Sequence, residues 1–150
     1  MQLTDFLTAG LAGGILMGLV AETGYRSGLF RMSLFLIDGE FAMKLIGLKH
    51  SRSLAYLLGL PIHLMTGTMF GLAYGLLCRF IPLNPQDPVT VGIYTFSLWI
   101  GMLFCALPIA GQGWMGRKAG NRVWFEQFFV HIAFGVGLWW VLGSIAEGSV

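Results

Sequence analysis

Four long apolar stretches constrain this chain more than any other feature of its sequence. Each is close to the ~20 residues that a helix needs to cross the hydrocarbon core of a bilayer. Of the 150 residues, 56% are hydrophobic and 11% are charged, whereas about a quarter are charged in a typical soluble domain. The sequence therefore predicts a single all-α integral membrane domain over residues 1–150, folded as a four-helix up-and-down bundle. The expected transmembrane helices run from about Leu3 or Phe6 to Val20, from Leu54 to Cys78, from Val89 to Pro108 and from Trp124 to Ala146.

The segment 28–53, between the first two expected spans, is too interrupted to cross a membrane. It has two short apolar parts, Leu29–Ile37 and Phe41–Leu48, each with one basic residue inside it. The Asp38-Gly39 pair between them is typical of a turn. We expect this segment to lie as amphipathic helix in the cytoplasmic interface of the membrane. Within the second span, Pro61 predicts a bend or a late helix start, because proline removes one helical hydrogen bond.

Basic residues are distributed unevenly among the expected loops. Eight of the nine lysines and arginines lie between spans one and two or between spans three and four, and only Arg79 lies between spans two and three. The positive-inside rule assigns the basic side to the cytoplasm and therefore both termini to the outside. With a net charge of +2 and no basic run, the sequence does not indicate a nucleic-acid partner.

Two histidines lie inside the expected spans, and each is followed four residues later by a glycine: His63 by Gly67, and His131 by Gly135. They lie eleven and nine residues beyond the last arginine before their spans, hence ~16 Å and ~13 Å from the basic edge at 1.5 Å per residue. Spans two and four are diagonal in an up-and-down bundle. This geometry suits ligation of one haem b iron by both imidazoles, with the two glycines leaving room for the macrocycle.

Two other interpretations of these histidines remain open. A buried imidazole in a membrane protein can simply hydrogen-bond a hydroxyl or carbonyl group of a neighbouring helix, and glycines four residues apart are typical of close helix packing. Ionisable groups inside a membrane are also candidates for proton transfer or for binding a quinone head group.

A second group of polar residues lies near the cytoplasmic ends of spans one and four. Glu22 and Arg26 are one helical turn apart, and Glu126 falls in the first turn of the last span. A carboxylate at this level could accept protons or hold a quinone head group. The alternative is structural: a Glu22–Arg26 ion pair, together with an exposed Glu126 that the helix dipole favours.

The spans with the histidines carry two longer motifs, His63-x3-Gly67-x2-Phe70-Gly71-x2-Tyr74 and His131-x2-Phe134-Gly135. These resemble two spans of a group of uncharacterised small four-helix bacterial inner-membrane proteins (YagU-like). The resemblance implies a bacterial inner membrane and no known activity. The paired histidines also resemble those of b-type membrane cytochromes, which often carry two histidines on one helix. Because this chain has one on each, it would hold one haem at most.

The short loops leave little aqueous surface, so we do not expect an enzyme that acts on its own. Gly10, Gly14 and Gly18 repeat the spacing that lets another transmembrane helix approach closely, which predicts association with other subunits or a second copy, besides contact with lipid. The expected function is an accessory or anchoring subunit of a larger membrane complex, in its sharper form an electron-transfer subunit with one haem b. The alternatives are a structural scaffold without a cofactor, and a small transporter or channel, which would need polar residues throughout its spans.

Overall fold

The computed structural model describes residues 1–148, which are all-helical and contain no strand. Four helical stretches are long and apolar enough to cross a membrane: Leu3–Arg26, Arg52–Phe80, Pro88–Ile109 and Val123–Glu147. The prediction of four such helices is confirmed. In chain order the elements are α1 Leu3–Arg26, α2 Leu34–Leu45, α3 Arg52–Phe80, α4 Pro88–Gly101, the π-helical turn η1 Met102–Ala106, α5 Leu107–Ile109, the 3-10 turn η2 Trp114–Gly116 and α6 Val123–Glu147.

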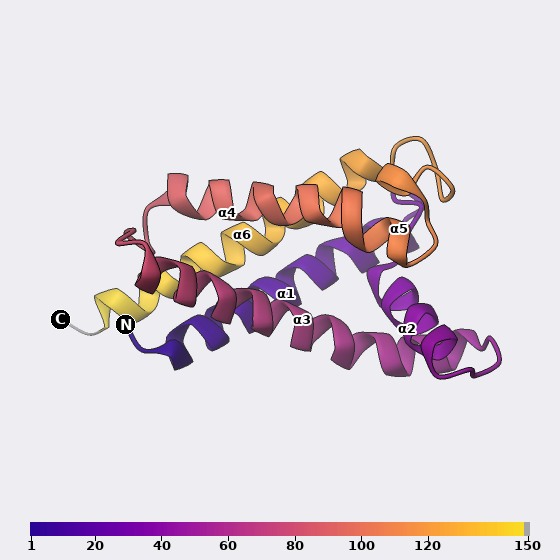
Figure 1. The fold of residues 1–150 in the computed structure, drawn as a ribbon, viewed down its shortest axis with the longest axis horizontal. Coiled ribbons are helices and arrows are strands. Elements are labelled where there is room, and N and C mark those ends of the chain that lie inside the picture. Colours follow the sequence, from indigo (N-terminus) through magenta and orange to yellow (C-terminus); the bar gives the residue numbers. More distant parts are fainter. Residues whose placement is uncertain (149–150) are drawn as a thin grey trace.

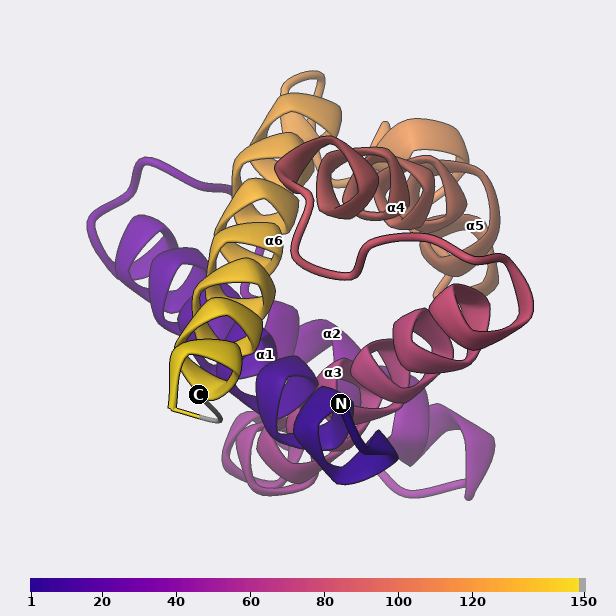
Figure 2. The same ribbon diagram turned by 90° about the vertical axis from the view of Figure 1, so that its left-hand side faces the viewer.

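The four long helical stretches alternate in direction, as an up-and-down arrangement requires (Figure 1). The N-terminus and the α3–α4 connection lie at one end, and α2 and the α5–α6 connection lie at the other. Around the bundle, α3 packs on α1, α1 on α6, and α6 on α4. The two helices that carry the candidate histidines, α3 and α6, are therefore diagonal to each other (Figure 2).

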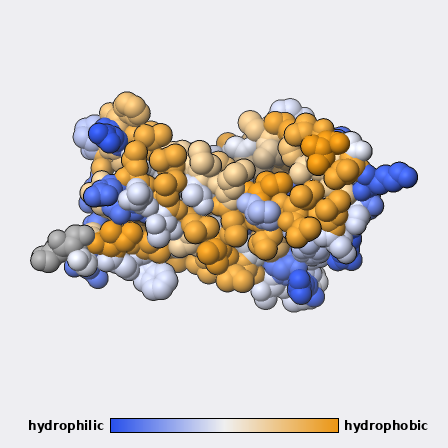
Figure 3. Space-filling model, turned by 90° about the horizontal axis from the view of Figure 1, so that it is seen from below, coloured by the Kyte–Doolittle hydropathy of each residue, from blue (hydrophilic) through white to orange (hydrophobic). Residues whose placement is uncertain are grey.

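Hydrophobic residues cover the middle of the molecule on the face seen in Figure 3, and hydrophilic residues gather toward its two ends. Many large apolar side chains are exposed, among them Leu19 at 60% and Met65 at 62%. Apolar side chains exposed over a whole flank would be unfavourable in water. The distribution is compatible with an integral membrane protein whose flank contacts lipid.

Glycines let the backbones of α1 and α3 approach closely. A Cβ atom added at Gly10 would lie 2.6 Å from the Cα of Gly71, and one added at Gly67 would lie 2.9 Å from the Cα of Gly14. Gly18 lies against side chains of α2 and α3. The prediction that Gly10, Gly14 and Gly18 offer a face to another subunit is therefore wrong, because helices of the same chain already cover that face.

The short helix α2 runs without interruption through Asp38 and Gly39, so the predicted turn at this pair is wrong. Gly39 contacts the backbone of Ala55, and Gly59 contacts the backbone of Phe35. The missing side chains of the two glycines allow α2 to lie directly on the first half of α3. Here tertiary packing outweighs the local preference of Asp-Gly for a turn.

The second and third long stretches each differ in one feature from what the sequence predicted. The helix α3 begins at Arg52 and continues through Pro61, so the late start that was one of the two predictions for this proline does not occur. The third stretch contains the π-helical turn Met102–Ala106 between α4 and α5. Such turns are rare in proteins, and those that occur often lie at functional sites.

The helices α3 and α4 meet near Tyr94 and diverge from there. The Tyr94 hydroxyl donates to the backbone oxygen of Phe70 at 2.6 Å, and its ring centroid lies 4.9 Å from that of Tyr74. Elsewhere along the described residues, these two helices are not packed against each other. Figure 2 shows the ribbons of α3 and α4 separated from each other in this view.

Candidate functional site

A cavity of about 580 Å³ lies between α3 and α4, and residues of α1, α2, η1, α5 and α6 complete its walls. We call this cavity the chamber. Most of its lining residues are apolar. Its oxygen- and nitrogen-bearing side chains are Asp38 of α2, His63 and Thr66 of α3, Ser97 of α4 and His131 of α6. The structure thus brings both candidate histidines to the walls of one cavity, although their helices are diagonal to each other in the bundle (Figure 2).

His63 is held through both of its ring nitrogens. Its Nε2 lies 3.2 Å from the backbone oxygen of Gly14, and its Nδ1 lies 3.3 Å from Oδ2 of Asp38. Because a carbonyl oxygen only accepts, Nε2 carries a hydrogen. The Nδ1–Asp38 contact then requires a second proton, held by either the imidazole or the carboxyl group. In both cases the His63–Asp38 pair is neutral as a whole, which suits a buried site.

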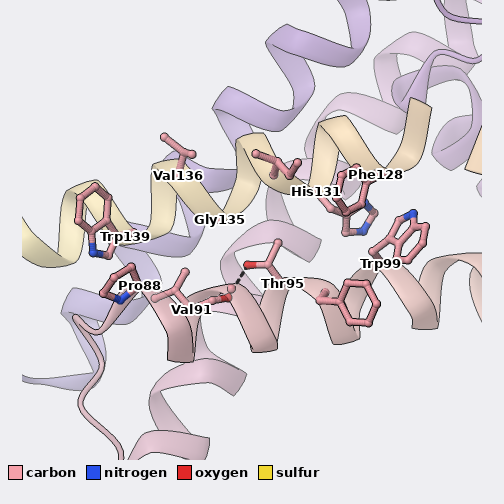
Figure 4. Close-up of a pocket in the computed structure, with 12 residues that line it drawn as sticks. Pro88, Val91, Thr95, Trp99, Phe128, His131, Gly135, Val136 and Trp139 are labelled. Atoms are coloured by element: carbon pink, nitrogen blue, oxygen red, sulfur yellow. Dashed lines mark hydrogen bonds between the residues drawn. The ribbon is translucent and has the colours of Figure 1, made fainter. Parts of the chain in front are cut away.

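His131 is held through only one ring nitrogen. Its Nδ1 donates to the backbone oxygen of Gln127 at 2.7 Å, so the lone pair of Nε2 has no protein partner within residues 1–148. The side chain also lines a groove of about 370 Å³ between α4 and α6. Figure 4 shows its ring directed from α6 toward α4, beside Trp99. His131, a buried side chain, therefore provides a hydrogen-bond acceptor that the protein does not use.

The glycines that follow the histidines serve contacts between helices. Gly67 faces the backbone of Gly14, and a Cβ atom added at Gly135 would lie 2.7 Å from Oγ1 of Thr95. That hydroxyl donates to the backbone oxygen of Val91 at 2.8 Å (Figure 4). Atoms of α1 and α4 thus occupy the space beside each glycine that a macrocycle was expected to use.

The two histidines do not fit ligation of one haem in this arrangement. An iron ligand must direct a nitrogen lone pair at the metal, and both nitrogens of His63 face oxygen atoms of the protein. Only Nε2 of His131 is available. Within residues 1–148, no group of three or more His, Cys, Asp or Glu side chains is placed to hold a metal ion. Haem b between His63 and His131 stays a prediction.

The predicted polar cluster, Glu22, Arg26 and Glu126, divides into two groups of contacts. Each group binds one residue of the connection between α1 and α2. Glu22 pairs with Arg26 at 2.7 Å and accepts a hydrogen bond from Ser33 at 2.8 Å. Glu126 is only 5% exposed and accepts the backbone N–H of Arg31 at 2.8 Å. The expected Glu22–Arg26 pair is confirmed. The expectation of an exposed Glu126 is wrong, because the α1–α2 connection covers this carboxylate.

Asp38 is a site residue that sequence reasoning missed. We interpreted it as part of a turn, whereas it lies on α2 and reaches His63. The available signal was an acidic residue within an apolar run, where an ionisable group needs a partner. A second missed group is the side chain of Gln127, whose Oε1 is buried without a hydrogen-bond partner within residues 1–148.

No protein-family model, curated protein or solved structure matches this chain. The resemblances to YagU-like proteins and to b-type membrane cytochromes therefore stay predictions. The chamber combines two buried histidines, His63 and His131, with the partly exposed Asp38.

Proposed function

We propose that this chain is an integral membrane protein that binds a hydrophobic, hydroxyl-bearing small molecule in the chamber, and that a quinol is the best candidate. The four long helices would cross the bilayer with the α2 end in the cytoplasm, because eight of the nine basic residues belong to that end. The observation that carries the proposal is the unused acceptor Nε2 of His131, a residue that lines this mostly apolar cavity.

The shape of the chamber supports a ligand that arrives from the lipid. Its volume of about 580 Å³ lies within the range of small-molecule sites, which are mostly apolar with a few convergent polar groups. Since α3 and α4 touch mainly at Tyr94, a molecule with an apolar tail can pass between them without crossing water. The tail would contact the apolar walls while the head group reaches the histidines.

The hydrogen bonds inside the chamber favour a ligand that donates. Thr66 donates its hydroxyl to the backbone oxygen of Ile62 at 2.9 Å, and Ser97 donates to that of Ile93 at 2.9 Å. His63 already uses both of its nitrogens. The chamber therefore offers acceptors and few free donors, and a hydroxyl group fits it better than a carbonyl group. For a quinone couple, this favours the reduced form.

A quinol site in the chamber agrees with the redox role expected from the sequence. A quinol site would make the chain a quinol-binding subunit of a membrane redox complex. In that role, the hydrogen-bonded His63–Asp38 pair would lie beside the head group. A quinol-binding role would still place the chain in an electron-transfer complex, and it requires no iron between the histidines.

The test compares binding of a short-chain quinol and of the matching quinone to the purified full chain in detergent. We expect the quinol to bind about fivefold more tightly, the effect of one hydrogen bond of about 1 kcal/mol. His131→Phe should abolish this difference. His50→Phe is the matched control, since His50 lies in the exposed α2–α3 connection and should leave the difference unchanged.

Equal binding of both forms by the unaltered protein would contradict the proposal, as would an equal effect of the two histidine substitutions. A reduced-minus-oxidised spectrum of the same preparation tests the haem prediction. An absorption band typical of b-type haem that is lost in His63→Ala and His131→Ala would favour haem over quinol.

A further inference from the structure

Basic and aromatic side chains form a second depression at the α2 end of the bundle, separate from the chamber. It has a volume of about 650 Å³ and lies between the end of α1, the α1–α2 connection and the start of α3. We call it the arginine pocket. Its lining residues are Tyr25, Arg26, Gly28, Phe30, Arg31, Arg52 and Tyr56, and none of these is acidic.

The positive charge of this pocket is only partly compensated. Arg26 pairs with Glu22, but Arg31 and Arg52 form no ion pair within the described residues. Arg52 instead donates to the Tyr25 hydroxyl at 3.3 Å. Since that hydroxyl accepts from Arg52, its own hydrogen is available to a ligand. The unpaired residues Arg31 and Arg52 and one phenol donor thus line the same depression.

The floor of the pocket is fixed by the backbone. The N–H of Phe30 donates to the backbone oxygen of Gly24 at 2.9 Å, and the Phe30 ring packs over that glycine. Gly28 makes the turn with a φ of +77°, a conformation that favours glycine. A pocket with a fixed floor loses less conformational freedom when a ligand binds than a flexible loop does.

We propose that the arginine pocket binds the phosphate group of an anionic phospholipid. Guanidinium groups match phosphate oxygens through paired, charge-assisted hydrogen bonds. Basic pockets between transmembrane helices at the cytoplasmic side suit anionic head groups. Leu29 and Leu57, close in sequence to lining residues, are 75% and 70% exposed. An acyl chain that leaves the pocket therefore has apolar surface to follow.

The test is a titration of the full chain in detergent with dioleoyl phosphatidylglycerol or with dioleoyl phosphatidylcholine, followed by native mass spectrometry. We expect one phosphatidylglycerol to bind roughly tenfold more tightly than phosphatidylcholine, because two arginines contribute to the difference. The double variant Arg31→Gln/Arg52→Gln should bind the two lipids equally. Arg31→Lys/Arg52→Lys should recover part of the preference, which also shows that the pocket tolerates substitution.

The matched control is Arg117→Gln/Lys118→Gln, which removes the same charge from the α5–α6 connection at the same end of the bundle. It should keep the full preference. An equal loss in the control, or no preference in the unaltered protein, would overturn the proposal. Competition by glycerol 3-phosphate distinguishes the source of the phosphate: displacement at similar concentrations would assign a soluble phosphate ester, and weak displacement would assign the lipid.

Discussion

The α1–α3–α6 side of the bundle and the α3–α4 side use glycine in opposite ways. On the first side, a Cβ atom added at Gly10, Gly67 or Gly137 would lie within 3 Å of a neighbouring backbone. On the second side, a Cβ atom at Gly101 of α4, which lines the chamber, would meet no atom within 4 Å. A glycine in a membrane helix therefore marks a helix contact only where a second helix lies against it.

This difference makes one side of the bundle rigid and leaves the other side accessible to a ligand. Close backbone approach fixes α1, α3 and α6 relative to one another, because little can shift where no side chain intervenes. The α3–α4 side lacks such contacts and contains the chamber instead. A rigid side that positions His63, and a looser side through which a ligand enters, together suit the binding function proposed above.

The largest effect is expected from adding a methyl group on the packed side. Gly10→Ala should lower the free energy of unfolding by about 2–3 kcal/mol, because the new Cβ atom would overlap the α3 backbone. Gly101→Ala, the matched change on the open side, should raise it by about 0.5–1 kcal/mol through helix propensity. Thermal unfolding of both variants in one detergent measures the contrast. Similar effects of the two changes would contradict the comparison.

The next largest effect concerns the contact of α2 with the chamber. Asp38→Ala leaves Nδ1 of His63 without its partner in a buried site, which should cost about 1–3 kcal/mol. Glu40→Ala on the same helix is the control, since its contact with His50 is 3.8 Å long and exposed on both sides. The free energy of unfolding in detergent should be clearly lower for Asp38→Ala than for Glu40→Ala. An equally small change for both would mean that the Asp38–His63 contact is unimportant for stability.

A smaller effect is expected at the one firm contact between α3 and α4. Tyr94→Phe removes the hydrogen bond to the Phe70 backbone and should lower the free energy of unfolding by about 1 kcal/mol. Ser97→Ala should change it less, because that hydroxyl bonds only within its own helix. If the contact also limits entry to the chamber, quinol should dissociate faster from Tyr94→Phe. An unchanged rate in stopped-flow measurements would assign entry to another route.

The smallest effect is a pH dependence at the start of α4. Asp87 caps this helix by accepting hydrogen bonds from the N–H and hydroxyl groups of Thr90, and these bonds lower the pKa of its carboxyl group. Its stabilisation is therefore present above the ordinary aspartate pKa and is lost as the pH falls through the lowered value. Asp87→Asn keeps a good cap without titrating. The melting temperature of the parent should fall more on acidification than that of Asp87→Asn.

The long helices could be predicted from the sequence because the length of an apolar run directly reflects the thickness of a bilayer. That His63 and His131 would come near each other was also accessible, since it needs only helix rise and loop positions, and both residues line the chamber. The contact between Asp38 and His63 was not, because it depends on how α2 folds back onto α3. The spacing of Gly10, Gly14 and Gly18 predicted a close helix contact, but spacing cannot distinguish a helix of the same chain from one of a partner.

The π-helical turn has a consequence for the whole third long helical stretch, Pro88–Ile109. Five residues of this stretch recur every fourth position: Val91, Thr95, Trp99, Leu103 and Leu107. Trp99 is partly buried and the other four are buried. In a regular α-helix this repeat would drift by about 40° at each step, and Leu107 would end nearly opposite Val91. The wider turn at Met102–Ala106 rotates the chain back and keeps a single inward edge. Deleting one residue there would leave a regular α-helix with the same inward edge, because the π-helical turn accommodates one extra residue.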